Sequence, residues 1–261
     1  MKNKFIFIAG PCVIESRDKT LKVATYLKNL TSKLNLQFIF KASFDKANRT
    51  SLKSYRGPGL KKGLAILSEI KKKLKVLVLS DVHSPEQVKV LGDTLDIIQI
   101  PAFLCRQTDL IVAAAKTKKI INIKKGQFLS PYDLKYIIDK VKSTGNKKIF
   151  LTERGSCFGY NNLVVDFRSF LIMKNFKFPV IYDVTHSLQR PSLESGISGG
   201  DKQFAKDLAL SAVACGVDGL FMEVHPDPKK ALSDKYTSLP LRDLKPILTK
   251  ALKIREVISK K

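Results

Sequence analysis

The sequence predicts one α/β domain over residues 1–261, folded as a single-domain (β/α)8 barrel, also called a TIM barrel. The length of 261 residues fits the roughly 250 residues of one such barrel without remainder. Eight short, almost continuously apolar runs recur along the chain, and segments with helical periodicity separate them. This alternation indicates parallel strands joined by helices, with an open, doubly wound sheet as the alternative.

The predicted strands are apolar at nearly every position, as expected of parallel strands buried on both faces. They are Phe5–Ala9, Phe38–Phe40, Val76–Leu79, Ile97–Ile100, Ile120–Ile123, Ile149–Leu151, Val180–Tyr182 and Leu220–Met222. Between them, residues 27–34 and 60–74 carry apolar side chains at helical spacing. Ser84 and Pro85 mark a helix start, and residues 244–258 predict a terminal amphipathic helix.

Lysine and arginine outnumber the acidic residues by 47 to 23, which gives a formal net charge of +24. The lysines are spread along the whole chain without a nucleic-acid-binding motif, so we expect no nucleic-acid partner. No apolar run approaches the roughly 18 residues of a membrane span, and the one near the N-terminus is too short for a secretory signal. We therefore expect a cytoplasmic protein with free cysteines and no membrane contact.

Polar or reactive side chains stand at or just after the end of every predicted strand. They are Cys12, Lys41, Asp81, Gln99, Lys124, Arg154, His186 and Glu223. In a (β/α)8 barrel the chemistry lies at the C-terminal ends of the strands. A barrel with a purely structural role would not need eight such residues, so the pattern indicates an enzyme.

The stretch Gln37–Gly59 begins as a strand and opens into a loop rich in cations and hydroxyl groups. Lys46 and Arg49 in this loop can donate charge-assisted hydrogen bonds to an anion. Lys124 and Arg154, at two other strand ends, add positive charge at the same barrel mouth. The pattern indicates a site for phosphate groups, and a solvated basic loop is the alternative.

Cys12, His186 and Glu223 follow the first, seventh and eighth predicted strands, which become neighbours when a barrel closes. Asp234 comes after the eighth strand. A thiolate, an imidazole and two carboxylates predict a divalent metal site that would accept iron, zinc, manganese, cobalt or cadmium. Cys12 as a small buried apolar residue is the alternative, and an open sheet would separate the group.

Other polar residues have weaker predicted roles. His83 and His225 are expected to orient loops, and the remaining cysteines, Cys105, Cys157 and Cys215, to be structural. The glycine-rich residues 189–203 predict a mobile loop after the seventh strand that could cover the site.

Long motifs along nearly the whole chain resemble the 3-deoxy-D-manno-octulosonate 8-phosphate synthases. They include AGPCVIES, FKASFDKANRTS, DIIQIPAFLCRQTDL, NIKKGQF, YDVTHSLQ and MEVHPDPKKALSDKYTSLPL. The resemblance implies a (β/α)8 barrel that forms a homotetramer. It also implies condensation of phosphoenolpyruvate with D-arabinose 5-phosphate and release of inorganic phosphate, a step of lipopolysaccharide biosynthesis.

The resemblance also implies roles for individual residues. The phosphoenolpyruvate ligands fall on Lys41, Lys46, Lys124 and Arg154, with Ser43 and Gln99 close by in the substrate-binding site. The sugar-phosphate ligands fall on Asn48, Arg49 and Thr50, and on Arg106 of a neighbouring subunit. The metal-independent members have Asn where this chain has Cys12, so Cys12, His186, Glu223 and Asp234 resemble the metal-dependent class. Cys12, His186, Asp234 and Lys46 are the catalytic candidates, with Lys46 and protonated His186 as alternative proton donors.

Two other functions are alternative interpretations of the sequence. The 3-deoxy-arabino-heptulosonate 7-phosphate synthases use erythrose 4-phosphate, but their signature resembles KPRTS where this chain has KANRTS. A nucleic-acid-binding protein is suggested by the net charge alone. The segment Arg190–Ile197 is less similar to the synthases than its flanks, so the resemblance does not extend to the predicted cover of the site.

Overall fold

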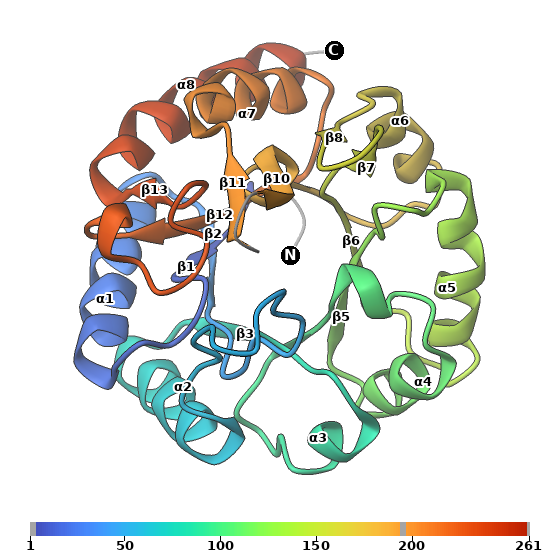
Figure 1. Cartoon of the computed structure of the whole chain (residues 1–261). Helices are drawn as coiled ribbons and strands as arrows, with labels where there is room; N and C mark the ends of the chain where they lie inside the picture. The colour runs from blue at the N-terminus through green and yellow to red at the C-terminus, as the bar shows by residue number, and fades with distance from the viewer. Residues whose placement is uncertain (1–3, 194–196, 260–261) are drawn as a thin grey trace.

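The computed structural model describes residues 4–193 and 197–259. Over these residues, eight parallel strands close into a barrel, and helices form a ring around it (Figure 1). The barrel closes because β1 (Ile6–Gly10) pairs in parallel with β12 (Gly219–His225). The predicted (β/α)8 barrel is therefore confirmed over the open sheet. The other barrel strands are β2 (Gln37–Lys41), β3 (Leu77–Asp81), β4 (Ile97–Ile100), β5 (Ile120–Lys124), β6 (Ile149–Glu153) and β9 (Val180–Asp183).

Two of the helices begin at serine caps. Ser16 accepts the N–H of Lys19 at the start of α1 (Arg17–Lys33), and Ser84 accepts the N–H of Gln87 at the start of α3 (Pro85–Lys89). The wall is completed by α2 (Leu60–Leu74), α4 (Thr108–Lys116), α5 (Leu134–Lys142), α6 (Arg168–Lys174), α7 (Ala205–Ala214) and α8 (Leu241–Ser259). Short 3-10 turns are η1 (Ala102–Leu104), η2 (Pro131–Asp133), η3 (His186–Leu188), η5 (Lys202–Phe204) and η6 (Pro228–Lys230).

Side chains alternate along each barrel strand between the interior and the helical layer. The interior carries an apolar ring to which each barrel strand contributes: Ile6, Ile8, Ile39, Leu79, Ile97, Ile120, Phe150, Ile181 and Phe221. The position two residues further along a strand faces the interior again, one layer closer to the C-terminal mouth. Lys41 therefore follows Ile39, and Glu223 follows Phe221. Because every second side chain of a strand faces the interior, the polar side chains at the strand ends point into the mouth.

Two hairpins and a short strand rise from the mouth. They are β7 (Ser156–Cys157) with β8 (Leu163–Val164), β10 (Gln189–Leu193) with β11 (Ile197–Gly200), and β13 (Leu239–Pro240) beside β12.

The structure shows a hairpin in the described part of the predicted mobile loop, residues 189–203. β10 and β11 pair antiparallel there, and Nε of Arg190 lies 2.6 Å from Oδ2 of Asp201 across their base. Gly200 permits a close approach, because a Cβ atom at this position would lie 2.2 Å from Cγ2 of Thr237. The predicted loop's tip, residues 194–196, lies outside the described residues. Among the helices of residues 4–193 and 197–259, none has the length and apolar character to cross a membrane.

Candidate active site

A cavity of about 350 Å³ opens at the C-terminal mouth of the barrel. Its walls come from the segments that follow β2, β4, β5, β6, β9 and β12. Seven residues predicted from the sequence line it: Lys46, Asn48, Arg49, Thr50, Arg154, His186 and Asp234. Gln127 and Gln189 also line it and were not predicted. The cavity thus joins the predicted anion loop and part of the predicted metal group in one site.

Lys41 and Glu223 form a buried ion pair at the mouth end of the barrel interior. The ammonium of Lys41 donates to Oε1 of Glu223 at 2.6 Å and to the backbone oxygen of Cys12 at 3.0 Å. Nζ of Lys46 lies 3.8 Å from the same Oε1. Burial alone would raise the pKa of Glu223, but His186, Lys41 and Lys46 hold it well below its usual range. Glu223 is therefore an anion whose charge offsets the lysines.

Lys124 and His186 share a second buried carboxylate, that of Asp183. Oδ2 of Asp183 accepts a hydrogen bond from Lys124 and lies 2.8 Å from Nδ1 of His186. Oδ1 accepts the backbone N–H of His186 at 3.0 Å. Burial lowers the pKa of Lys124 to about 8, although Asp183 opposes this shift. Asp183 thus fixes both a cation and the imidazole of the site.

Asp183 was missed because the predicted strand stopped at Tyr182, the last apolar residue of its run. The signal that would have found it is the period of two, since Asp183 lies two residues beyond the interior Ile181. His186, which was taken as the strand-end residue, lies on the following 3-10 turn.

Gln189 was also missed, and it links two predicted site residues. Its Oε1 accepts from Nη2 of Arg154 at 2.8 Å, and its Nε2 donates to Oδ1 of Asp234 at 2.8 Å. Nη1 of Arg154 is buried without a hydrogen-bond partner. Gln189 therefore holds the guanidinium of Arg154 through Nη2, and Nη1 can donate a hydrogen bond to a ligand.

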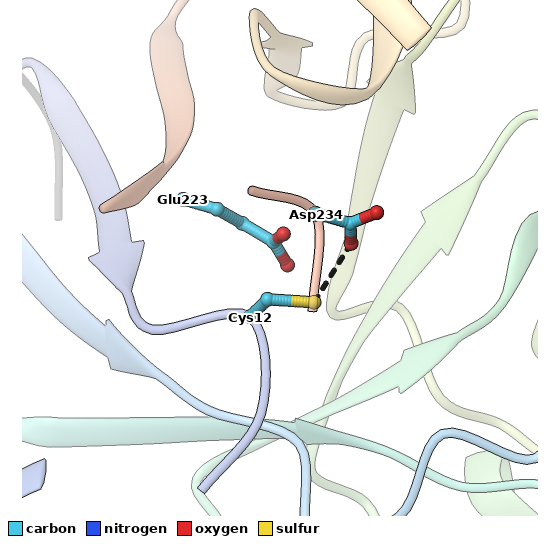
Figure 2. A group of neighbouring side chains, drawn as sticks. All are labelled: Cys12, Glu223 and Asp234. Atoms are coloured by element: carbon cyan, nitrogen blue, oxygen red, sulfur yellow. Dashed lines mark hydrogen bonds between the residues drawn. The ribbon is translucent and has the colours of Figure 1, made fainter. Parts of the chain in front are cut away.

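Cys12, Glu223 and Asp234 form the core of a candidate metal centre (Figure 2). One possible ligand atom from each lies within 4.8 Å of the others. The thiol of Cys12 donates to Oδ2 of Asp234 at 2.8 Å, and Oγ of Ser233 lies 2.9 Å from the sulfur. Oε2 of Glu223 is buried without a hydrogen-bond partner, which is expected of an oxygen that can bind a cation. Thiolate and carboxylate donors suit a divalent transition metal.

His186 stands beside this group. Its Nε2 lies 3.6 Å from Oε1 of Glu223 and 3.9 Å from Oδ2 of Asp234. Burial raises the pKa of Cys12 well above its usual value, and the carboxylates of Asp234 and Glu223 raise it further. A cation that binds here must therefore displace the thiol proton.

The remaining predicted residues lie around the cavity. Ser43 is buried and its Oγ has no hydrogen-bond partner, while Oε1 of Gln99 accepts from Asn122 at 3.0 Å. Asp81 lies 3.3 Å from Nε2 of His83. Arg106 is exposed on the segment between β4 and α4 and is absent from the residues that line its own chain's cavity.

The cysteines and the last histidine have different surroundings. Cys105 is buried, as a structural role requires, and Cys215 is partly buried. Cys157 is exposed, so packing does not account for it. His225 contacts Glu15, with 3.4 Å between Nε2 and Oε1.

Comparisons with known proteins identify the relatives of this chain. Residues 1–259 match the DAHP synthetase I family. Curated relatives named 2-dehydro-3-deoxyphosphooctonate aldolase cover nearly the full chain. The relative from Desulfatibacillum aliphaticivorans is 56% identical over 97% of this chain and 93% of its own length. Those from Geobacter metallireducens and Pelobacter propionicus are each 54% identical, over 98% and 99% of this chain and 93% and 95% of their own lengths.

Proposed function

The chain belongs to the DAHP synthetase I family, and on this basis we propose that it is a 3-deoxy-D-manno-octulosonate 8-phosphate synthase. It condenses phosphoenolpyruvate with D-arabinose 5-phosphate and water to give 3-deoxy-D-manno-octulosonate 8-phosphate and inorganic phosphate. The names of the curated relatives favour this reaction over the erythrose 4-phosphate alternative. The product serves lipopolysaccharide biosynthesis.

The observation that carries the proposal is one cavity that joins a set of cations to His186 and Asp234 of the candidate metal group. Lys46, Arg49 and Arg154 line the cavity. Nη2 of Arg49 and Nη1 of Arg154 are buried without partners, so each can donate to an anionic oxygen. Two phosphorylated substrates, one of which also carries a carboxylate, fit this excess of donors.

In the proposed reaction, C3 of phosphoenolpyruvate attacks the aldehyde carbon of the sugar phosphate, and the aldehyde oxygen takes up a proton. Water adds at C2 and loses a proton, which gives a tetrahedral hemiketal phosphate. This species expels phosphate by cleavage of the C2–O bond, the proton of the C2 hydroxyl passes to the departing phosphate, and the new ketone remains. Lys124 and Arg154 hold the enol phosphate in place and stabilise the charge that develops on it.

Two residues that line the cavity are suited to protonate the aldehyde oxygen, Lys46 and His186. Burial alone would lower the pKa of Lys46, but Cys12, Glu223, Asp81 and Asp234 raise it well above its usual value. Lys46 is therefore fully protonated near neutral pH, as a donor must be.

The metal ligands we propose are Cys12, His186, Glu223 and Asp234. Bound there, a divalent iron, zinc, manganese, cobalt or cadmium ion would polarise the aldehyde or lower the pKa of the attacking water. Ser233 and Gln189 orient Cys12 and Asp234 through the contacts described above.

We also propose a homotetramer. Arg106 is exposed and outside its own chain's cavity, which is compatible with a guanidinium that serves a neighbouring subunit.

The test is the consumption of phosphoenolpyruvate by chelator-treated protein, with and without Mn²⁺. We expect turnover with arabinose 5-phosphate that requires the metal, and little turnover with erythrose 4-phosphate. Turnover with erythrose 4-phosphate alone would support the alternative reaction. Equal turnover without metal would retain the reaction and reject the metal ligands, whereas no turnover with either sugar would refute the enzyme.

A further inference from the structure

Glu15 lies outside the cavity lining, yet its carboxylate joins the two loops that carry Cys12 and Asp234. It stands three residues after Cys12, and its side chain is 6% exposed. Its Oε1 accepts the backbone N–H of Leu232 at 2.8 Å. Leu232 comes two residues before Asp234, so this one hydrogen bond ties the Asp234 loop to the Cys12 loop.

The same carboxylate also contacts the strand that carries Glu223. Oε1 of Glu15 lies 3.4 Å from Nε2 of His225, two residues beyond Glu223 on β12. The other ring nitrogen of His225 faces the backbone of Asp227, where the loop begins. Oε2 pairs with Lys19 at 3.1 Å on the first turn of α1. One buried group therefore touches segments next to three candidate metal ligands.

The segment that carries Glu15 is fixed independently of this contact. The N–H of Ile14 donates to the backbone oxygen of Ser43 at 3.0 Å, and the N–H of Ser43 donates to that of Cys12 at 3.3 Å. The hydroxyl of Tyr55 donates to the backbone oxygen of Ile14 at 3.0 Å. The backbone next to Glu15 is thus held against the segment that follows β2. The carboxylate of Glu15 therefore restrains the loop after β12.

That loop needs such a restraint because Asp234 has a left-handed backbone conformation, with φ of 49°. Residues other than glycine adopt this region at a cost and stay in it only when their surroundings hold them there. The backbone oxygen of Asp234 accepts N–H groups from Thr237 at 3.1 Å and Ser238 at 2.8 Å. These bonds fix the C-terminal side of the turn, and the Glu15–Leu232 bond fixes its N-terminal side.

We propose that Glu15 is a positioning residue that holds the Asp234 loop against the Cys12 loop and thereby sets the geometry of the metal site. Removal of its carboxylate leaves the Leu232 N–H without its acceptor and His225 without its partner, so the turn at Asp234 relaxes away from Cys12. The inference rests on the proposed metal-dependent function.

The experiment measures Co²⁺ binding to the full-length, chelator-treated protein without substrates. A Cys12 thiolate on Co²⁺ gives a charge-transfer absorption band, which Cys12→Ser should abolish. We expect Glu15→Ala to bind Co²⁺ about tenfold more weakly than the wild type. Deuterium exchange of the apo protein should be faster over residues 231–238 in this variant. Glu15→Gln, whose amide oxygen still accepts the Leu232 N–H, should bind Co²⁺ nearly as well as the wild type.

Glu69→Ala is the matched control, since Glu69 on α2 also binds two cations, Arg17 and Lys73. It should leave Co²⁺ binding and exchange over residues 231–238 unchanged. A folded Glu15→Ala protein with wild-type affinity would overturn the inference and leave the proposed function intact. Absence of the band in the wild type would instead reject the metal site itself.

Glu15→Gln decides the matter if Glu15→Ala does not fold. Retention of both Co²⁺ affinity and slow exchange over residues 231–238 supports the inference. Loss of affinity with exchange unchanged overturns it, because the metal site would then depend on Glu15 by a route other than the loop.

Discussion

The thiol of Cys12 donates to Oδ2 of Asp234 at 2.8 Å, although 222 positions separate the two residues in the chain. Closure of the barrel brings them together, since β1 pairs with β12 and each residue lies beyond the end of one of these strands. Without a cation the thiol keeps its proton, because burial and the neighbouring carboxylates raise the pKa of Cys12. Without a metal ion, Cys12 therefore remains a thiol that donates to Asp234. A bound metal ion would take the place of the thiol proton.

Cys12→Asn tests the role of this pair in catalysis. The asparagine amide can donate to Asp234 as the thiol does but is a poor ligand for a transition metal. We expect Cys12→Asn to retain measurable condensation activity that added Mn²⁺ no longer increases. Steady-state rates with and without a chelator measure this. A folded but wholly inactive variant would contradict the expectation.

Arg49→Ala tests the assignment of the sugar-phosphate site. Arg49 lines the cavity on the loop after β2 and has a buried nitrogen without a partner. Loss of a charged hydrogen bond to phosphate costs about 1.5–3 kcal/mol, or roughly 10–100-fold in affinity. We expect this rise in the KM for arabinose 5-phosphate and a much smaller rise for phosphoenolpyruvate. Equal changes in both KM values would refute the assignment.

The sequence was sufficient for the fold because parallel strands buried on both faces leave long apolar runs with helical segments between them. It was nearly sufficient for the strand-end residues because the side-chain period of two carries the interior face of each strand into the mouth. Lys41 and Glu223 were found because each directly follows the apolar run of its strand. The ion pair between these two residues was not predicted, because barrel closure determines which buried cation contacts which carboxylate.

Apart from Asp183, the residues that were missed do not follow apolar runs. Gln189 joins Arg154 to Asp234, and Ser233 contacts Cys12, through loops whose paths depend on tertiary contacts. The hairpin of β10 and β11 was missed for the same reason, because its glycines resemble those of an irregular loop in sequence. Gly200 instead permits a close approach to Thr237.

Deprotonation of Lys124 should reduce the activity of the enzyme at alkaline pH. Burial lowers its pKa to about 8, so the free enzyme carries the ammonium below this pH and loses it above. Binding of an anionic substrate should weaken as the charge disappears, and kcat/KM for phosphoenolpyruvate should fall above about pH 8. A guanidinium stays charged throughout this range, so Lys124→Arg should remove the fall from the pH profile.

Lys124→Ala completes this test. Without the cation, kcat/KM should be roughly 10–100-fold lower below pH 8, and the alkaline fall should be absent. The same alkaline fall in the arginine and alanine variants would assign it to another group, and near-normal rates in Lys124→Ala would show that the charge is not needed.

Asp183→Asn separates the two roles of the carboxylate shared by Lys124 and His186. The asparagine oxygen can still accept the backbone N–H of His186, so the turn after β9 should be kept. The negative charge beside Lys124 is lost, and a buried cation without its partner lowers the free energy of unfolding by about 3–5 kcal/mol. Because Asp183 favours the charged form of Lys124, its removal should also shift the alkaline fall in kcat/KM to a lower pH.

Urea unfolding and the pH profile measure these two effects on one protein. Asp166→Asn is the matched control, since Asp166 pairs with Arg168 at the exposed surface, where an ion pair contributes little. It should change neither quantity appreciably. If Asp183→Asn lost stability but kept the wild-type alkaline limit, Asp183 would support the fold without setting the charge of Lys124, and the alkaline limit would have to arise elsewhere in the site.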